Sequence, residues 1–216
     1  MISRPPRRVL IDYGISNIFA FRHKLEIHGI ACEVGSSPED VENATLLIIP
    51  GVGHFSSAMN VLDSVGLVPA IQDKVLVHKT PVVGVCLGLQ LLTEFSEEGS
   101  RAGLSLIRGN TVQMESEETT SEKFANVRWG RLEKNAHAGD ALRAGISGQY
   151  YFCHSYRVEC EPELIVAYSC ARGLKFPAII RSGHIVGIQF HPEKSHSHGV
   201  VLLAEIIREL EESSER

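Results

Sequence analysis

The 216-residue sequence predicts an α/β fold: a three-layer open mixed sheet, mostly parallel, with flanking helices and an added antiparallel hairpin region. Three observations lead to this prediction. Short, continuously apolar runs alternate with helical segments over the first 95 residues, which is typical of parallel strands covered on both faces. Strand-like runs dominate after Gly99. Two of the last runs are separated by Ser182-Gly183, a hairpin signal.

In the first half, apolar runs predict four strands, each followed by helical segments. The strands are expected at residues 9–13, 31–34, 45–49 and 81–85. Ser16 is the expected cap of the first helix, which would run to Ile27 with Ile18, Phe21 and Leu25 at helical spacing and end before Gly29. A proline with acidic neighbours predicts a second helix start at residues 37–40. Further helices are expected at residues 56–65, 67–78 and 87–95.

The second half predicts a run of strands and a closing helix. Strands are expected at residues 104–107, 111–114, 125–132, 150–158, 165–170, 177–181 and 184–190. The polar stretch 115–123 predicts a loop or hairpin tip, and residues 199–210 form an amphipathic helical pattern. No repeat or change in composition divides the chain, so we expect a single domain over residues 1–216 with its core at about 9–210.

Composition excludes several classes of protein. A formal net charge of -5 and 6% aromatic residues do not suit a nucleic-acid-binding surface. The five cysteines are odd in number and lack C-x-x-C spacing, which argues against a disulfide framework or a structural zinc site. The basic N-terminus lacks the apolar run of a secretory signal, and the longest apolar stretch is too short to span a membrane. We therefore expect a cytoplasmic protein with no nucleic-acid or membrane partner.

The segment Gly84-Val85-Cys86-Leu87-Gly88 has the pattern of a nucleophile elbow with cysteine in place of serine. A buried strand runs directly into a helix, and the flanking glycines allow a cramped turn. The helix N-terminus would favour the thiolate form of Cys86, and the free N–H of Leu87 could face a developing oxyanion. The alternative is a small buried cysteine at a strand–helix junction.

His191 and Glu193 are two residues apart around Pro192 and can share one side of an extended chain. Together with Cys86 they would form a triad of nucleophile, base and orienting carboxylate. A strand-end histidine beside a solvated glutamate is the alternative. A metal site made by these two residues with His196 and His198 lacks helpful cysteine spacing, so no metal is expected.

Glycines follow the third predicted strand in Gly51-Val52-Gly53. Exposed backbone N–H groups at the carboxyl end of a strand could supply a second oxyanion donor. A phosphate-binding loop is the alternative, but neither G-x-G-x-x-G nor Walker-A spacing is present.

Taken together, these segments resemble the class I glutamine amidotransferase family over about residues 9–210. The motifs that carry the resemblance are PGVGHF at 50–55, GVCLGLQLL at 84–92, HSY at 154–156 and GIQFHPEKS at 187–195. Within that family the chain is most similar to the glutaminase subunits of imidazole glycerol phosphate synthase. That closer resemblance rests on IDYGISNI at 11–18, Ala58-Met59 after PGVGHF, FSEEG at 95–99 and HPEKS at 191–195.

The resemblance implies a glutaminase that releases ammonia from L-glutamine without a cofactor. It implies Cys86 as nucleophile, His191 as the proton-transfer group and Glu193 as its orienting carboxylate. Gln90 and the segment His154, Ser155 and Tyr156 would bind the substrate. The chain is too short for a second substrate domain, and the resemblance implies a cyclase or synthase partner with a (β/α)8 barrel that takes up the ammonia in a heterodimer.

The middle strands depart from the family pattern. Residues 126–131 read Asn-Val-Arg-Trp-Gly-Arg where the closer relatives show His-Met-Gly-Trp-Asn. Because the resemblance places this stretch near the partner, Trp129 is an expected interface contact. Lys194, next to the triad, is a second expected contact, although it could be an ordinary surface lysine. Three alternatives stay open: a glutaminase for a sugar-modifying or other acceptor enzyme, a γ-glutamyl cysteine hydrolase, and a non-enzymatic binding module.

Overall fold

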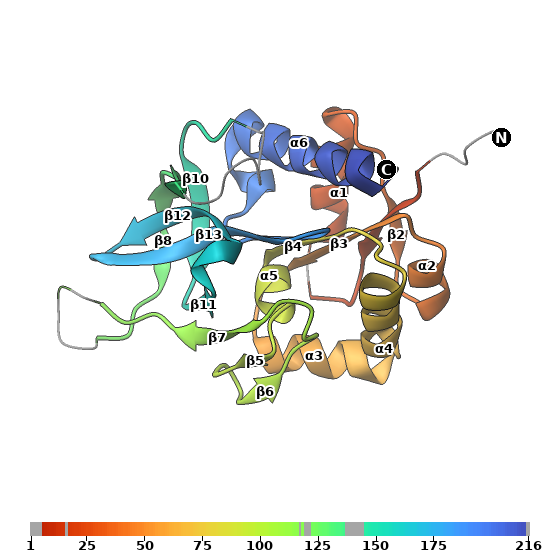
Figure 1. Cartoon of the computed structure of the whole chain (residues 1–216), viewed down its shortest axis with the longest axis horizontal. Coiled ribbons are helices and arrows are strands. Elements are labelled where there is room, and N and C mark those ends of the chain that lie inside the picture. Colours follow the sequence, from red (N-terminus) through yellow and green to blue (C-terminus); the bar gives the residue numbers. More distant parts are fainter. Residues whose placement is uncertain (1–5, 16, 117, 119–121, 137–144, 215–216) are drawn as a thin grey trace.

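The computed structural model describes residues 6–15, 17–116, 118, 122–136 and 145–214. A mixed sheet passes through the middle of the molecule (Figure 1). Its strand order is β2-β1-β3-β4-β14-β13-β12-β9. Parallel pairing joins β2 to β1, β1 to β3, β3 to β4 and β4 to β14, and the remaining pairs are antiparallel. The strands are β1 (Arg8–Ile11), β2 (Glu33–Gly35), β3 (Leu46–Gly51), β4 (Val82–Cys86), β9 (Glu133–Lys134), β12 (Ile165–Ala171), β13 (Leu174–Ser182) and β14 (Ile185–Ile188).

Helices cover both faces of this sheet (Figure 1). On one face, α1 (Ile18–Ile27) and α6 (His196–Ser214) pack over alternate strand residues such as Leu10 and Ile48. On the other, α2 (Pro38–Glu42), α3 (Phe55–Ser64), α4 (Leu67–Gln72) and α5 (Leu87–Leu91) cover the residues between them, including Ile11 and Ile49. A π-helical turn, η1 (Asp73–Val77), continues α4. The predicted three-layer fold is confirmed.

Two small sheets lie beside the central one. One has the order β11-β7-β5-β6, and the other pairs β10 with β8. Their strands are β5 (Phe95–Ser96), β6 (Arg101–Ala102), β7 (Gly109–Gln113), β8 (Asn126–Gly130), β10 (Tyr150–His154) and β11 (Tyr156–Cys160). Short 3-10 turns, η3 (Pro162–Leu164) and η4 (Pro192–Lys194), precede β12 and α6. Glu115 and Lys123 pair at the base of the polar stretch, as a hairpin requires.

Two of the predicted elements are wrong for one shared reason. The helix predicted at 87–95 ends at Leu91, and residues 104–107 form no strand. The backbone N–H groups of Leu104 and Leu106 donate to the carbonyls of Leu91 and Leu92 instead. The apolar run at 104–107 therefore satisfies the C-terminal carbonyls of α5, which otherwise lack partners.

Other elements are present with boundaries that differ from the prediction. The strand expected at 150–158 is interrupted at Ser155, because β10 pairs with β8 whereas β11 pairs with β7. The third strand continues through Gly51, opposite Cys86 of β4. Asn17 caps α1 by accepting from the N–H of Ala20, and the predicted cap, Ser16, lies outside the described residues. Ser37 caps α2 in a capping box, as its sequence indicates.

All five cysteines lie in the described ranges and are free. Of the helices in those ranges, none is long and apolar enough to cross a membrane.

Candidate active site

The turn from β4 into α5 holds Cys86 in a backbone conformation that non-glycine residues rarely adopt, with φ 55° and ψ −108°. The flanking glycines make this turn possible. A Cβ on Gly84 would lie 2.6 Å from the carbonyl oxygen of Gly88, and a Cβ on Gly88 would overlap the carbonyl oxygen of Ile49. The predicted elbow is therefore present, and the Cys86 side chain is 4% exposed.

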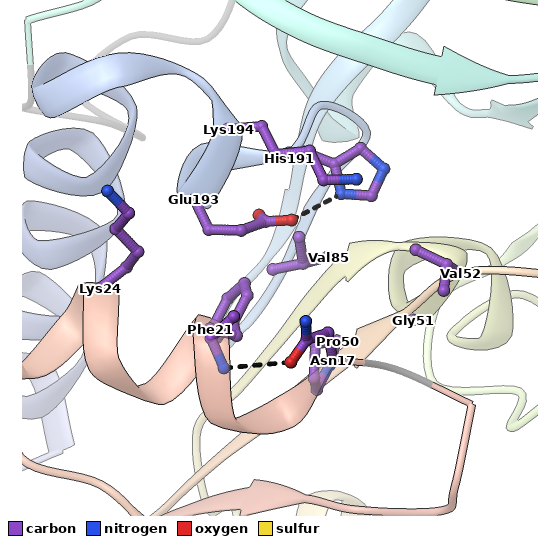
Figure 2. Close-up of a pocket in the computed structure, with 11 residues that line it drawn as sticks. Asn17, Phe21, Lys24, Pro50, Gly51, Val52, Val85, His191, Glu193 and Lys194 are labelled. Carbon is purple, nitrogen blue, oxygen red and sulfur yellow. Dashed lines mark hydrogen bonds and ion pairs between the residues drawn. The ribbon is translucent and has the colours of Figure 1, made fainter.

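His191 and Glu193 lie side by side, with His191 Nδ1 3.0 Å from Glu193 Oε1 (Figure 2). The backbone of His191 is extended, as expected before proline, but Glu193 lies in the 3-10 turn η4 and not in an extended chain. The N–H of His191 donates to the carbonyl of Tyr151 at 2.8 Å, and Ser195 Oγ donates to the carbonyl of His191 at 2.6 Å. Ser195 Oγ also accepts from the N–H of Tyr151, so β10 and η4 are held together.

Electrostatic and hydrogen-bond interactions connect His191 to Cys86. Burial lowers the pKa of His191, but the charge and hydrogen bond of Cys86, followed by those of Glu193, outweigh it and raise the pKa to about 10. Cys86 and Glu193 therefore favour the charged, imidazolium form of His191. Because the folded pKa exceeds the ordinary value, the stability contributed is full below about pH 6.5 and is lost as the pH rises through about 10.

Replacing Cys86 with alanine is expected to lower the pKa of His191 from its value in the wild type, because burial then opposes the charged form with Glu193 as the remaining partner. A pH titration of the imidazole nitrogens by NMR measures this change. His184 is the internal control, since its Nε2 lies 2.8 Å from the Val75 carbonyl and its own carbonyl accepts from the N–H of Val82, at the opposite end of β4 from Cys86. An unchanged pKa for His191 in the variant would contradict the interaction with Cys86.

The segment predicted to hold the oxyanion lies against the elbow. Gly51 is paired with Cys86 across β3 and β4, and a Cβ on Gly51 would lie 2.9 Å from Leu87 Cβ. Val52 follows and is half-exposed, and Gly53 has φ +101°. The end of β3 thus lies next to the first residue of α5, so the two segments predicted to hold the oxyanion are neighbours.

A cavity of about 260 Å³ opens beside His191 and Glu193 (Figure 2). It lies between α1, the end of β3 and η4. The residues that line it are Asn17, Ala20, Phe21, Lys24, Pro50, Gly51, Val52, Val85, His191, Glu193 and Lys194. Cys86 and Gln90, both described residues, are not in this lining, so the cavity reaches the carboxylate side of the cluster and not the sulfur.

The predicted substrate residues lie together next to the elbow. Gln90 is buried, and its Nε2 donates to the carbonyl of Tyr156 at 3.1 Å. His154 is buried with both ring nitrogens in contact: Nδ1 lies 2.7 Å from the carbonyl of Tyr156 and Nε2 lies 2.9 Å from Asn126 Nδ2. The carbonyl of Ser155 accepts from the N–H of Met114. His154 thus supports the backbone of Tyr156.

Sequence reasoning missed Gln189 and Tyr151. Gln189 is fully buried, and its Nε2 lies 4.0 Å from Cys86 Sγ. The two-residue spacing that paired His191 with Glu193 could also have placed Gln189 near His191. No sequence signal indicated Tyr151, because its contact with His191 depends on an antiparallel bridge between two segments that are distant in the sequence.

The four residues considered as metal ligands are not gathered into one group that could bind a metal ion. His196 stacks on Trp129 with ring centroids 4.7 Å apart, and His198 Nε2 lies 2.5 Å from the carbonyl of Gln149. Within the described part of the chain, no group of three or more His, Cys, Asp or Glu side chains is arranged to hold a metal ion.

Comparison with known proteins gives concordant matches. A sequence model of the family "Glutamine amidotransferase class-I" matches residues 9–208. The chain is 36% identical to imidazole glycerol phosphate synthase subunit HisH 2 of Pseudomonas aeruginosa, over 92% of this chain and 98% of the relative. It is 34% identical to the subunit HisH 2 of Methanococcus maripaludis, over 93% and 98%, and 37% identical to HisH 1 of Campylobacter jejuni, over 92% and 98%.

Solved structures agree on the fold. PurLQS from Thermotoga maritima aligns with a TM-score of 0.70 at 20% identity, over 96% of this chain and 100% of that one. A structure described as a glutamine amidotransferase aligns with a TM-score of 0.67 at 15% identity, over 96% and 99%. With the family match spanning almost the whole sequence, the chain belongs to the class I glutamine amidotransferases.

Proposed function

We propose that this chain is the glutaminase subunit of an imidazole glycerol phosphate synthase. It hydrolyses L-glutamine to glutamate and ammonia and passes the ammonia to a synthase partner in histidine biosynthesis. The observation that supports this proposal most directly is the cluster at the elbow. Cys86, in a strained turn, interacts with His191, whose Nδ1 lies 3.0 Å from the Glu193 carboxylate. The names of the relatives support the choice of synthase.

In the first step, the Cys86 thiolate attacks the side-chain amide carbon of glutamine. The N–H of Leu87 and the backbone of Gly51, Val52 and Gly53 hold the oxyanion. The His191 imidazolium then gives its proton to the departing nitrogen, so ammonia leaves and a glutamyl thioester remains. The raised pKa of His191 supports this order, because the proton needed by the leaving group is already in place.

In the second step, neutral His191 takes a proton from water, whose oxygen attacks the thioester carbon. The tetrahedral intermediate collapses, glutamate leaves, and the thiolate and imidazolium are restored. Glu193 keeps His191 in the required orientation and stabilises its charged form in both steps.

Gln90 and Tyr156 are proposed to contact the substrate, with Ser155 beside them. The His154 ring supports this segment through its contact with the Tyr156 carbonyl. The hydrogen bond from Gln90 to the Tyr156 carbonyl supports this grouping, because it joins α5 to β11 next to the sulfur. The pKa of Tyr156 is raised by burial and by the nearby carboxylates of Glu98 and Glu97. The Tyr156 hydroxyl therefore keeps its proton and can act as a hydrogen-bond donor to the substrate.

Ammonia release from L-glutamine tests the proposal, measured for the chain alone and with the cyclase subunit of the same organism. Turnover that rises in the presence of that subunit is expected. Turnover of γ-glutamyl peptides without any partner would favour a γ-glutamyl hydrolase instead. No glutamine turnover, with the cyclase subunit or with other acceptor enzymes, would overturn the glutaminase assignment.

The partner is proposed to be a (β/α)8-barrel cyclase subunit that forms a heterodimer with this chain and gives the complex its lyase activity. Trp129 and Lys194 are the proposed contacts. Trp129 is 39% exposed, and its ring lies edge-on to Tyr151 at 5.7 Å. Lys194 Nζ lies 5.8 Å from the centre of the same Tyr151 ring. One surface next to His191 thus carries both residues, which supports a partner seated over the active site.

Replacing Trp129 or Lys194 with alanine is expected to weaken binding of the cyclase subunit at least about fivefold, because aromatic and cationic anchors carry much of the free energy of an interface. Titration of labelled chain with the cyclase subunit measures the dissociation constant. Val77→Ala and Lys79→Ala are the matched controls, since both side chains are exposed just before β4, at the opposite end of the strand from Cys86. Unchanged affinity in both test variants would contradict the proposed surface.

We also propose that the whole chain acts as one domain in the cytoplasm. The central sheet supports the first point, because it includes strands from Arg8 to Ile188. The five free cysteines support the second, since disulfides are the usual state of such residues in oxidising compartments.

A further inference from the structure

A chain of amide groups runs through the interior between the sulfur and the proposed substrate residues. Gln189 Nε2 donates toward Cys86 Sγ at 4.0 Å, and Gln189 Oε1 accepts from Gln90 Nε2 at 3.4 Å. Gln90 Nε2 also donates to the Tyr156 carbonyl at 3.1 Å. One side chain thus contacts both the proposed nucleophile and a proposed substrate residue.

Gln189 occupies a position where packing alone would favour an apolar side chain. It is fully buried, between the fully buried Ile188 and Phe190. Its backbone N–H donates to the carbonyl of Ala178 at 2.9 Å, which fixes the direction of the side chain. Burying an amide is unfavourable unless its hydrogen bonds are made, and the partners here are Cys86 and Gln90.

We propose that Gln189 is a positioning residue for glutamine hydrolysis: its amide N–H stabilises the Cys86 thiolate while its carbonyl holds Gln90 in place for the substrate. The first part concerns the sulfur alone. The second part rests on the proposed function, because it assigns Gln90 to substrate binding.

The Gln189 amide differs from the other groups around Cys86 because it does not titrate. His191 approaches from the segment before η4 and Tyr13 from the end of β1, and His154 on β10 interacts in turn with His191. Burial and then the charge of Cys86 raise the pKa of Tyr13, and the Tyr13 hydroxyl donates to the Pro50 carbonyl. His191 loses its proton as the pH rises, whereas the Gln189 amide keeps its donor at every pH.

The test uses Gln189→Met, which keeps the length of the side chain but removes both polar groups. The rate of Cys86 alkylation by iodoacetamide is followed from pH 6 to pH 10 by peptide mapping on the full chain. The variant is expected to react at least about tenfold more slowly at pH 7, the loss expected for a hydrogen bond to a charged group. The difference should narrow at high pH, because the thiol then ionises without help. A misplaced sulfur would instead slow the reaction equally at every pH.

Gln72→Met is the matched control, because Gln72 lies on α4, donates through its Nε2 to the Leu104 carbonyl and has no part in the proposed site. It should react at the wild-type rate. Should Gln189→Met fail to fold, as judged by urea unfolding, Gln189→Asn provides the test, since its shorter amide cannot span from Cys86 to Gln90. Wild-type alkylation profiles in a folded Gln189 variant would overturn the proposal.

Steady-state kinetics with L-glutamine, in the complex with the cyclase subunit, test the second part. Gln189→Met is expected to raise KM as well as to lower kcat, because it releases Gln90. Lowered kcat with unchanged KM would refute the link to Gln90 and leave the link to Cys86. The alkylation assay does not need glutamine turnover, so its result remains valid if the proposed function fails.

Discussion

Glutamine hydrolysis is expected to fall at least about 1,000-fold when Cys86 is replaced with serine. The serine hydroxyl does not ionise near neutral pH, so the site loses its nucleophile and His191 keeps only Glu193 as an anionic partner. The fold should persist, because serine is close to cysteine in size and the backbone of the elbow is unchanged. Ammonia release with the cyclase subunit present, together with circular dichroism, measures both results.

Cys170→Ser is the control for this substitution, since Cys170 is exposed on β12 and has no part in the proposed site. It should retain wild-type turnover. Full activity in Cys86→Ser would mean that another group is the nucleophile.

Gly88→Ala is expected to destabilise the protein by about 3 kcal/mol or more and to abolish glutamine hydrolysis, since the added methyl group would overlap the main-chain carbonyl oxygen of Ile49. The carbonyl belongs to β3 in the middle of the sheet and cannot move without breaking strand pairing. The strand and α5 would have to separate, which would displace Cys86 and the N–H of Leu87. Urea unfolding and ammonia release measure the two effects.

Gly145→Ala is the matched control, because a Cβ there would meet open space. Its free energy of unfolding should stay within about 0.5 kcal/mol of the wild type. Equal stability of the two variants would show that β4 and α5 do not pack as tightly as the structure indicates.

The elbow could be predicted because its requirements are local. A buried strand, a cysteine and two glycines stand within five residues, and a turn this cramped requires glycine at 84 and 88. The pair His191 and Glu193 was also within reach, since the two are neighbours around a proline. The expectation that both residues share one side of an extended chain was partly wrong, however, because Glu193 lies in the 3-10 turn η4.

The features that could not be predicted depend on contacts between distant segments. Leu87 to Leu92 is apolar enough for a longer helix, but the segment that ends α5 comes twelve or more residues later. The break at Ser155 reflects a change of pairing partner from β8 to β7. The cavity beside Glu193 forms between α1 and η4, which are more than 160 residues apart in the sequence.

Contacts around the active site could not be predicted for the same reason, because they too depend on the pairing of distant strands. Gln189 was visible in the motif, but its contact with Cys86 requires β14 and β4 to be neighbours, which the sequence alone does not state. Trp129 and Lys194 were predicted as separate contacts, and their common position around Tyr151 depends on the pairing of β8 with β10.

Covalent labelling by a diazo-ketone analogue of glutamine tests the central claim most directly, because the reagent needs both a glutamine pocket and an activated nucleophile. The chain is treated in complex with the cyclase subunit, with and without excess L-glutamine, and the modified peptide is identified by mass spectrometry. We predict a label on Cys86 that glutamine prevents, and no label on Cys32, Cys153, Cys160 or Cys170. A label on another cysteine, or ammonia release that continues after Cys86 is fully labelled, would contradict the account.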